Sequence, residues 1–424
     1  MRWPRIGRAH IDCSHSRRDF LRRGLYGLGV TAGLPMVLDR TSAALAAQAL
    51  GETDEKHPRR ILVVVELSGG NDGLNTVVPF GDDAYYRARP NLGIRRNKLL
   101  PIADGVGLHP SLVGFERLYK DGMLAVVEGC GYPNPSLSHF TSMGFWHTGV
   151  PNGGEKLGWV GRFGDAHTPD GKRNLIVNIA NSQSLAVRGQ VNSPLVFNDP
   201  GRFQREGEED EIAALTRLSG AHATRNSELD FLRATAENAT ESSAFVRQAW
   251  SGYRTPVDYG LGGADLRKVA ALIAADMPTR VYYVSFSGNS FDTHVHQADL
   301  HARLLMYMSD AVRGFMEDVQ RLGRADDVAV VLFSEFGRRV EENASLGTDH
   351  GTAGPMFVVG NQLKGGFYGK TPSLTDLDDG NLEMTTDFRR VYATMIDEWM
   401  GYSDTGAVLK GDYQPLGVFG ASRA

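Results

Sequence analysis

The sequence predicts an α/β protein with a mostly parallel β-sheet that helices cover on both faces. Short apolar runs rich in β-branched residues alternate along the chain with segments of helical periodicity, which is the pattern of such sheets. Polar or glycine-rich residues follow these runs, as expected at the carboxyl edge of a parallel sheet, where ligands bind. The 424 residues, 42% hydrophobic and 22% charged, suffice for one large or two modest domains.

The predicted strands are short and apolar, so each would be buried between two layers of helices. In chain order they are Ile61–Val65, Met123–Val127, Leu175–Val177, Val281–Val284 and Val328–Phe333. The best predicted helix runs from about Leu300 to Leu322, where apolar residues recur at steps of three and four. Segment 204–250 has few strand formers and an acidic run, and we expect a helical insertion there. A solvated helical pair is its simplest interpretation, with a lid or partner surface as the alternative.

The first residues indicate export. Arg17 and Arg18 precede a glycine-containing apolar run over residues 25–38, which is typical of a twin-arginine signal and too short to span a bilayer durably. Small residues after it fit an A-x-A cleavage site, so residues 1–46 are the predicted signal peptide, with a retained anchor as the alternative. We therefore expect a periplasmic or extracellular protein whose partner during export is the twin-arginine translocase. No stable transmembrane segment is expected in the mature chain.

Cysteine content and charge narrow the functional classes. Cys13 lies within the predicted signal, which leaves Cys130 in the mature chain, so no intramolecular disulfide is expected. The formal net charge is −5, and the mature part has no basic tract. We therefore expect neither nucleic acid nor an anionic membrane as a partner.

One short segment concentrates side chains that can ligate a metal. Asp292, His294 and His296 lie within five positions, and Asp349 and His350 follow downstream. Neutral imidazole nitrogen and anionic carboxylate oxygen suit a divalent ion such as Zn²⁺ or Mn²⁺. Residues four apart can reach one ion from the first turn of a helix or from its entry loop. We interpret the segment as half of a metal site, with solvated loop side chains as the alternative.

Further polar side chains follow other predicted strands. Glu66 follows the first strand, Ser138 and His139 lie in a loop after the second, and Glu335 follows the fifth. The carboxyl ends of parallel strands meet at one edge of the sheet. We therefore expect one pocket to be built by Glu66, Asp292, His296, Glu335 and His350.

This order resembles the alkaline phosphatase and sulfatase superfamily. There, an acid after the first strand, a Ser or Thr nucleophile at a helix start, an Asp-x-x-x-His pair, a late acid and a last His hold two metals. Asp292 and His296 have the Asp-x-x-x-His spacing, and His350 resembles the last His. The loop 138–149 resembles the nucleophile segment, including its Trp-x-Thr-Gly ending. The resemblance implies an alkaline-phosphatase-like three-layer α/β/α sandwich.

The chain departs from that superfamily pattern in its ligands. Phe336 stands where the superfamily usually has a His after the late strand, so the second metal lacks an imidazole ligand. Glu66 and Glu335 stand where Asp is usual. His139 rather than Ser138 falls in the nucleophile column, so either Ser138 attacks or His139 replaces the missing ligand.

Within the superfamily, residues 58–415 resemble a twin-arginine-exported bacterial group catalogued as domain-of-unknown-function family 1501. Four motifs carry this resemblance. They are Glu66-Leu67-Ser68-Gly69-Gly70-Asn71-Asp72-Gly73-Leu74-Asn75, Ser138-His139-Phe140, Asp292-Thr293-His294 and Ser334-Glu335-Phe336-Gly337-Arg338.

The resemblance implies an exported, metal-dependent hydrolase of phosphate or sulfate esters, acting on a small-molecule or polymer substrate. The nucleophile would be Ser138 or a metal hydroxide with His139 as ligand or general base, and Arg338 could clamp a tetrahedral anion. Zinc is the first choice of ion, with manganese, calcium or magnesium as alternatives. Its ligands would come from Glu66, Asp292, His294, His296, Glu335 and His350.

Two other functions are compatible with these residues. A non-catalytic exported protein could keep the fold and one structural metal while binding an envelope polymer or a secretion partner, and Phe336 favours that possibility. A metal-dependent mutase or transferase would share the site and differ in its acceptor. Asp292, His296, His350 and both glutamates favour an enzyme, since a scaffold has little need for so many acids at one sheet edge.

Overall fold

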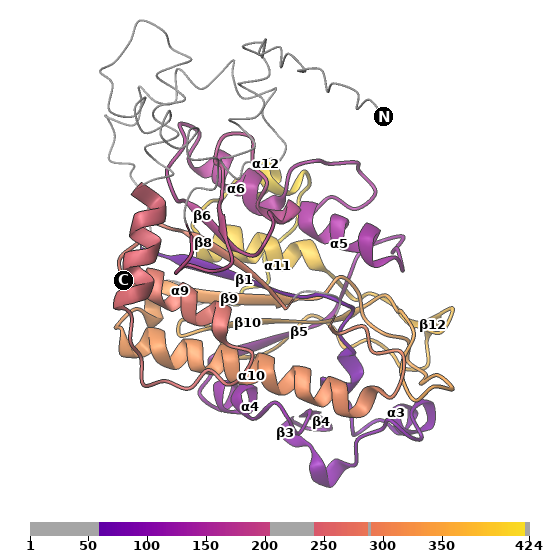
Figure 1. The fold of residues 1–424 in the computed structure, drawn as a ribbon. Coiled ribbons are helices and arrows are strands. Elements are labelled where there is room, and N and C mark those ends of the chain that lie inside the picture. The colour runs from indigo at the N-terminus through magenta and orange to yellow at the C-terminus, as the bar shows by residue number, and fades with distance from the viewer. Residues whose placement is uncertain (1–58, 204–240, 287–289, 420–424) are drawn as a thin grey trace, which may run out of the picture. The chain divides into compact units, whose positions relative to one another are not determined.

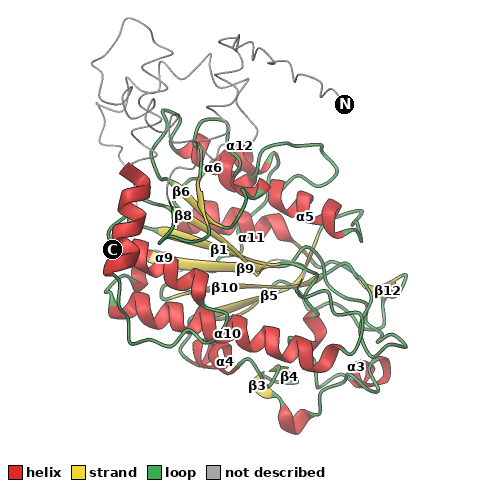
Figure 2. Ribbon diagram, viewed as in Figure 1, coloured by secondary structure: helices red, strands yellow, loops and turns green. Residues whose placement is uncertain are grey.

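A β-sheet of nine strands forms the core of the part of the chain that the computed structural model describes, residues 59–203, 241–286 and 290–419 (Figures 1 and 2). The chain divides into two compact units. The larger, residues 43–202 and 246–424, holds the sheet and its helices. The smaller, residues 1–42 and 203–245, lies almost wholly outside the described residues.

All five strands expected from the sequence form, and they provide most of the sheet. They are β1 (Ile61–Leu67), β5 (Leu124–Gly131), β6 (Ile176–Ile179), β8 (Val281–Phe286) and β9 (Val328–Phe333). The strand order is β11-β5-β10-β9-β1-β8-β6-β7, with β14 paired to β5. β1 pairs in parallel with both β8 and β9, and all of its residues are buried. The prediction of a mostly parallel, doubly covered sheet is confirmed.

β10 (Gly354–Gly360) runs antiparallel to both of its neighbours, β5 and β9. The loop 334–353 joins the carboxyl end of β9 to the amino end of β10 at the same edge of the sheet, so the returning strand must reverse direction. That loop carries several of the expected site residues. The remaining strands of the sheet are short: β7 (Leu195–Phe197), β11 (Gly366–Tyr368) and β14 (Thr386–Asp387).

Helices lie on both faces of the sheet, so the three layers expected from the sequence are present (Figure 1). One face is covered by α4 (Val113–Lys120), α9 (Ala264–Ala274) and α10 (Gln297–Arg321). The other is covered by α5 (His139–Thr148), α6 (Trp159–His167), α11 (Phe388–Thr394) and α12 (Thr405–Leu409). Of the expected insertion 204–250, residues 241–250 are described and are helical. The predicted signal peptide, residues 1–46, lies outside the described residues.

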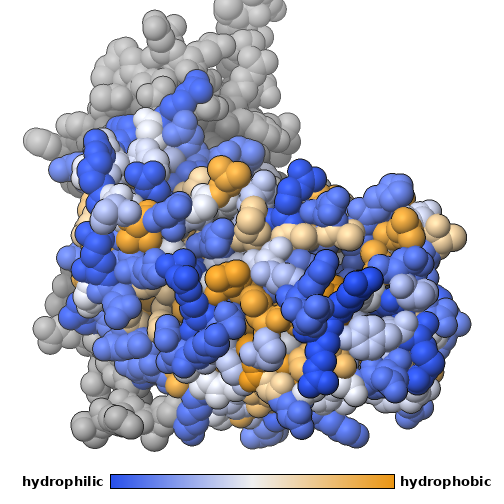
Figure 3. All heavy atoms as spheres, turned by 90° about the horizontal axis from the view of Figure 1, so that it is seen from below, coloured by the Kyte–Doolittle hydropathy of each residue, from blue (hydrophilic) through white to orange (hydrophobic). Residues whose placement is uncertain are grey.

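The remaining elements are short. A three-stranded sheet contains β2 (Val77–Val78), β3 (Leu100–Ala103) and β4 (Val106–Leu108), and β12 (Leu377–Asp378) pairs with β13 (Asn381–Leu382). The short helical elements are η2 (Gly73–Asn75), α3 (Asp83–Ala88), η3 (Arg96–Lys98), η4 (Leu185–Val187), η5 (Ala325–Asp327) and η6 (Met395–Trp399). Most of the face seen in Figure 3 is hydrophilic, with smaller hydrophobic groups among the polar ones. Within the described ranges, no helix combines the length and the apolar character needed to cross a bilayer.

Stacked aromatic rings fix α5 against the sheet. The ring of Trp146 stacks on Phe333, at the end of β9, with centroids 5.4 Å apart, and on Phe388 of α11 at 4.1 Å. Such pairs contribute about 0.5–1.5 kcal/mol each beyond the area they bury. Because α5 begins at His139, this packing determines where that histidine enters the site.

Candidate metal centre

The loop after β1 encloses the carboxylate of Glu335. The backbone N–H of Gly69 lies 2.9 and 3.1 Å from the two Glu335 oxygens, and the Gly70 N–H donates to Oε2 at 3.0 Å. Gly69 has φ +121°, and a Cβ there would lie 2.5 Å from the backbone nitrogen of Asp292. Glycine is therefore required for this close approach. The result is a fully buried carboxylate held by main-chain donors at the centre of the sheet edge.

Glu335 in turn orients His139, the first residue of α5. Glu335 Oε1 lies 2.8 Å from His139 Nδ1, and an ionised carboxylate can only accept, so Nδ1 is the donor. That hydrogen bond, ahead of the opposing effect of burial, raises the pKa of His139. The other ring nitrogen, Nε2, is buried without a hydrogen-bond partner and lies 3.3 Å from Asp292 Oδ2. A ring nitrogen that is buried, has no hydrogen-bond partner and is aimed at a carboxylate has the arrangement expected of a metal ligand.

Two more histidines are fixed in the same way. His350 Nδ1 donates to the Leu137 carbonyl at 2.7 Å, and His294 Nδ1 lies 3.2 Å from Asp349 Oδ1. The acceptors leave the Nε2 atoms of His294 and His350 facing one another at 2.9 Å. Two imidazole lone pairs repel at this distance unless a proton or a cation lies between them.

Asp292 joins the three imidazoles. Its Oδ1 lies 2.9 Å from His294 Nε2 and 3.3 Å from His350 Nε2, while Oδ2 faces His139. Donor atoms of His139, Asp292 and His350 all lie within 4.8 Å of one another. Ligands about 2.0–2.1 Å from a tetrahedral ion are separated by about 3.3–3.4 Å, which is close to the two 3.3 Å separations. The donor set fits a borderline divalent ion such as zinc.

Arg338 connects the loops around this centre. Its Nε donates to the Gly70 carbonyl at 2.6 Å, Nη1 to the Thr348 carbonyl at 2.8 Å, and Nη2 to Asp292 Oδ1 at 2.7 Å. Burial would raise the pKa of Asp292, but Arg338 and the neighbouring histidines outweigh it and lower that pKa. The guanidinium is buried and its donors are engaged within the protein, so Arg338 holds the loops together rather than presenting a free fork to an anion.

Glu66 lies in a separate hydrogen-bonded group. Its Oε2 lies 2.7 Å from His147 Nε2 and accepts from the Tyr283 hydroxyl, and Oε1 accepts from Ser285 at 3.0 Å. Burial would raise the pKa of Glu66, but the partnership with His147 and the two hydroxyl donors lower it overall. Both oxygens are occupied, and among the described residues Glu66 does not belong to the group of atoms that could hold a metal ion.

His296 and Ser138 lie at the margin of the centre. His296 precedes α10 with φ 45°, and its exposed side chain is outside the group of donor atoms. The segment enters α10 as a loop, where residues two apart can face one side, so His294 accompanies Asp292 instead. Ser138 is the exposed residue before α5, and its side chain makes no capping hydrogen bond.

A buried polar network that we did not anticipate holds the loop after β1. Asp72 forms an ion pair with Arg89 at 2.6 Å, with both side chains fully buried. Asn71 Oδ1 lies 2.9 Å from His301 Nε2 on α10, and burial lowers the pKa of His301 to about 3. The signal was present in the Gly69-Gly70-Asn71-Asp72-Gly73 motif, but its partners lie too far away in the sequence to be inferred from it.

Comparisons with known proteins agree with the expected family. The model of a family described as "Protein of unknown function (DUF1501)" matches residues 59–411. No curated protein matches the chain.

Three solved structures show distant similarity to the chain. A protein in the alkaline phosphatase superfamily from Vibrio parahaemolyticus has a TM-score of 0.35 and 10% identity, covering 90% of this chain and 79% of its own. The PsFucS1 sulfatase from Pseudoalteromonas sp. has a TM-score of 0.36 and 11% identity, covering 91% and 77%. The C-terminal periplasmic domain of EcEptC from Escherichia coli, in complex with Zn, has a TM-score of 0.32 and 10% identity, covering 74% and 77%. At these values we transfer no residue role from them.

Proposed function

The chain belongs to the DUF1501 family, whose description names no activity, and from that premise we propose that it is an exported, metal-dependent hydrolase of phosphate or sulfate esters. The observation that carries the proposal is the convergence of three imidazole Nε2 atoms on Asp292. Each of these rings has its Nδ1 bound to an acceptor: Glu335 for His139, Asp349 for His294 and the Leu137 carbonyl for His350.

A purely structural cluster would not be built in this way. The unpartnered Nε2 of His139 costs about 1–3 kcal/mol of stability, and the facing Nε2 atoms of His294 and His350 add repulsion. An ion bound by His139, Asp292 and His350 would satisfy His139 Nε2 and also the His350 Nε2 that faces His294. The outer partners fix each ring before the ion binds, which is how metal-ligating histidines are usually held.

The charge of the centre favours an anionic substrate. Arg338 already balances Asp292, and the three imidazoles are neutral when they act as ligands. With the carboxylates of Glu335 and Asp349 counted as well, a divalent ion would bring the centre to about neutral, and the open position of the ion would be the local positive charge that a phosphate or sulfate ester meets. When bound, such an ion supplies Lewis-acid polarisation of an ester oxygen and lowers the pKa of water to about 7.

The protein's own residues then position the reactants. Glu335 and the stacked Trp146 fix His139, while Arg338 fixes Asp292 together with the Gly69–Gly70 loop. Ser138 precedes His139 and is exposed, so it is the candidate side-chain nucleophile, with water as the alternative. This assignment makes His139 a ligand and separates it from the attacking group.

A second candidate function is that of an exported binding protein with one structural metal. The ring of Phe336 packs against His139 and His350, with centroids 4.9 and 4.7 Å away, where a second metal ligand was expected from the superfamily pattern. A single-ion centre is therefore the consistent expectation. Either function requires export, for which Arg17 and Arg18 are the motivating residues.

The test is a metal analysis of protein folded in its producing cell, followed by a screen of 4-nitrophenyl phosphate, bis(4-nitrophenyl) phosphate and 4-nitrophenyl sulfate. We expect about one divalent ion per chain, with cleavage that chelation removes and the same ion restores. Metal-loaded protein that cleaves no phosphate, sulfate or phosphonate ester in a broad screen would support the binding protein instead. Replacing Arg17 and Arg18 with Lys should leave the precursor in the cytoplasm, and normal export of that variant would refute the signal assignment.

A further inference from the structure

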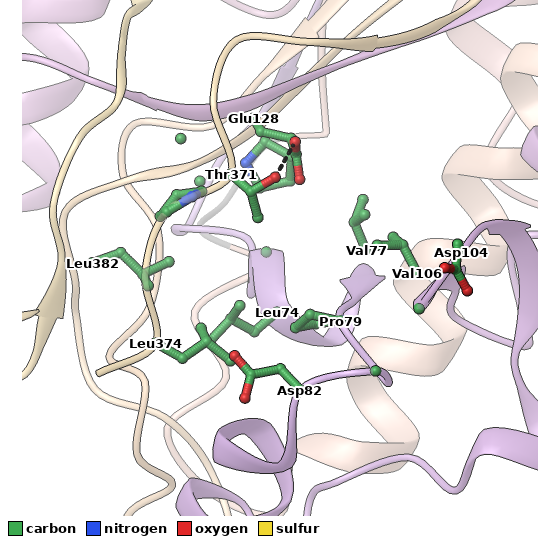
Figure 4. Close-up of a pocket in the computed structure, with 17 residues that line it drawn as sticks. Leu74, Val77, Pro79, Asp82, Asp104, Val106, Glu128, Thr371, Leu374 and Leu382 are labelled. Atoms are coloured by element: carbon green, nitrogen blue, oxygen red, sulfur yellow. Dashed lines mark hydrogen bonds between the residues drawn. The ribbon is translucent and has the colours of Figure 1, made fainter. Parts of the chain in front are cut away.

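A cavity of about 450 Å³ opens beside the loop after β1, outside the group of metal-ligating residues. Its volume falls in the range of small-molecule sites, roughly 300–1,000 Å³. Its walls come from η2, the β2–β4 sheet, the start of α3, β5, the start of β10 and the arm between β11 and β14. Figure 4 shows side chains from these segments pointing toward one space.

Most of the cavity wall is apolar and preformed. The apolar lining is provided chiefly by Leu74, Val77, Pro79, Val106, Leu374 and Leu382. Leu74, Leu374 and Leu382 also belong to one hydrophobic cluster of buried residues, so that side of the wall is part of a packed core. A ligand with an apolar body would therefore meet an ordered surface rather than a mobile loop.

The charged groups of the cavity all have one sign. Asp82, Asp104 and Glu128 line it, and no Lys, Arg or His is among the described lining residues. Figure 4 shows the three acids apart from one another around the cavity, with Glu128 hydrogen-bonded to Thr371. The Thr371 hydroxyl donates to Glu128 Oε2 at 2.8 Å. The wall therefore repels a phosphate or sulfate group and attracts a cation.

The separation of the carboxylates distinguishes between kinds of cation. Among the described residues, these three acids do not form a group whose oxygens could hold one metal ion. An inorganic cation would gain little from them, whereas an organic ammonium ion can use one carboxylate and bury its carbon atoms against the apolar wall. Glu128 is the half-buried acid of the three, and burial raises its pKa, so its charge is incompletely solvated.

We propose that this cavity is a binding site for a small organic amine, with its apolar body against Leu74, Val106 and Leu374 and its ammonium group at Glu128. The site is separate from the ester-binding centre and does not depend on the proposed hydrolase activity. It touches the same two loops, since Gly73 follows the Gly69–Gly70 turn and Gly354 follows His350. An amine bound here would contact the segments that hold the metal-ligating residues.

The test uses three probes that share one apolar body: 4-phenylbutylamine, 4-phenylbutan-1-ol and 4-phenylbutyric acid. Calorimetric titration of the full folded chain at pH 7.5 should show the amine binding at least about tenfold more tightly than the acid, with the alcohol between them. Glu128→Gln should reduce amine binding to the level of the alcohol. Val106→Trp should weaken all three, because it fills the cavity.

Two matched controls complete the experiment. Asp376→Asn removes an exposed carboxylate from the same β11–β14 arm but outside the cavity, and it should leave amine binding unchanged. His350→Ala should also leave it unchanged, which keeps the result independent of the metal centre. Equal binding of amine and acid, or amine binding that survives both Glu128→Gln and Val106→Trp, would overturn the proposal. If Val106→Trp does not fold, Thr371→Val takes its place, because it removes the hydroxyl that orients Glu128. Thr371→Val should weaken amine binding, and amine binding that survives both Glu128→Gln and Thr371→Val would overturn the proposal.

Discussion

Replacing Glu335 by Gln tests whether the outer hydrogen bonds build the metal centre. The carboxylate accepts from the N–H groups of Gly69 and Gly70, from the Ser334 hydroxyl and from His139 Nδ1. A glutamine keeps one acceptor oxygen, but its NH₂ group then faces donors that need an acceptor. Its oxygen can accept either from the N–H groups of Gly69 and Gly70 or from His139 Nδ1, so one of these partners loses its acceptor.

The magnitude follows from these bonds. Each hydrogen bond to a charged group contributes about 1.5–3 kcal/mol, so losing one or two of them should lower the free energy of unfolding by about 3 kcal/mol. Loss of an outer partner of a metal-ligating histidine typically costs roughly 10–100-fold in metal affinity. We therefore expect Glu335→Gln to weaken zinc binding by that factor, since His139 Nε2 would no longer be held in one tautomer and direction.

Glu66→Gln is the matched control. Glu66, the penultimate residue of β1, is also a buried glutamate at the carboxyl edge of the sheet and pairs with a histidine, His147, yet it lies outside the group of donor atoms. Zinc affinity is measured by competition with a chromophoric chelator at pH 7.5, and stability by urea unfolding of the metal-free protein. Both variants should lose stability, and only Glu335→Gln should lose metal affinity. Equal affinity in the parent and Glu335→Gln, or a larger loss in Glu66→Gln, would refute the assignment.

The other predictions concern single side chains. His350→Ala should lower metal affinity by more than the roughly 10–100-fold typical of an outer partner, whereas His296→Ala, at an exposed position, should not change it, as metal titration can show. If Ser138 is the nucleophile, Ser138→Ala should abolish ester cleavage, and a trapped covalent adduct on Ser138 in the parent protein would confirm this role. Appreciable activity in the variant would instead assign the attack to water. The free energy of unfolding should decrease as the pH is lowered below 6.5. Burial lowers the pKa of His109 to about 4 and of His301 to about 3, whereas in the unfolded chain both histidines take up a proton near pH 6.5. Each histidine should lower the free energy of unfolding by about 1.4 kcal/mol per pH unit, which is about 2 kcal/mol at pH 5. His301→Gln should therefore make the free energy of unfolding in urea less dependent on pH.

The strands were predictable because their signal is local. A buried parallel strand is a short apolar run ending in polar residues, and β1, β8 and β9 all read this way. The long helix begins at Gln297, three residues before the expected Leu300, because the N–H groups of His296 and Gln297 bond to carbonyls of the loop 345–346. Apart from β6, the strands of two to four residues were missed, since runs of that length carry no clear periodicity.

The site was predictable in composition and less so in geometry. Asp292, His139 and His350 were among the expected residues because they follow strands whose carboxyl ends meet at one edge. Spacing favoured His296 as the partner of Asp292, since positions four apart share a helix face. The structure places the helix start one residue after His296 and brings His294 to Asp292 instead. The hydrogen bonds from Arg338 to backbone carbonyls could not be predicted either, because every residue has a carbonyl and the sequence does not show which of them a side chain will reach.

The origin of the candidate donors along the chain has a consequence for folding order. His139 begins α5, Asp292 and His294 precede α10, and His350 lies between β9 and β10, so the outermost donors are 350 − 139 = 211 positions apart. Closing such long loops costs entropy that the sheet must repay before the ligands can meet. An ion therefore cannot nucleate this domain as zinc nucleates a small finger, where neighbouring ligands fold around it. An ion at the proposed centre would bind a completed sheet and stabilise it by mass action, so removing the ion should leave a folded protein with a lower Tm.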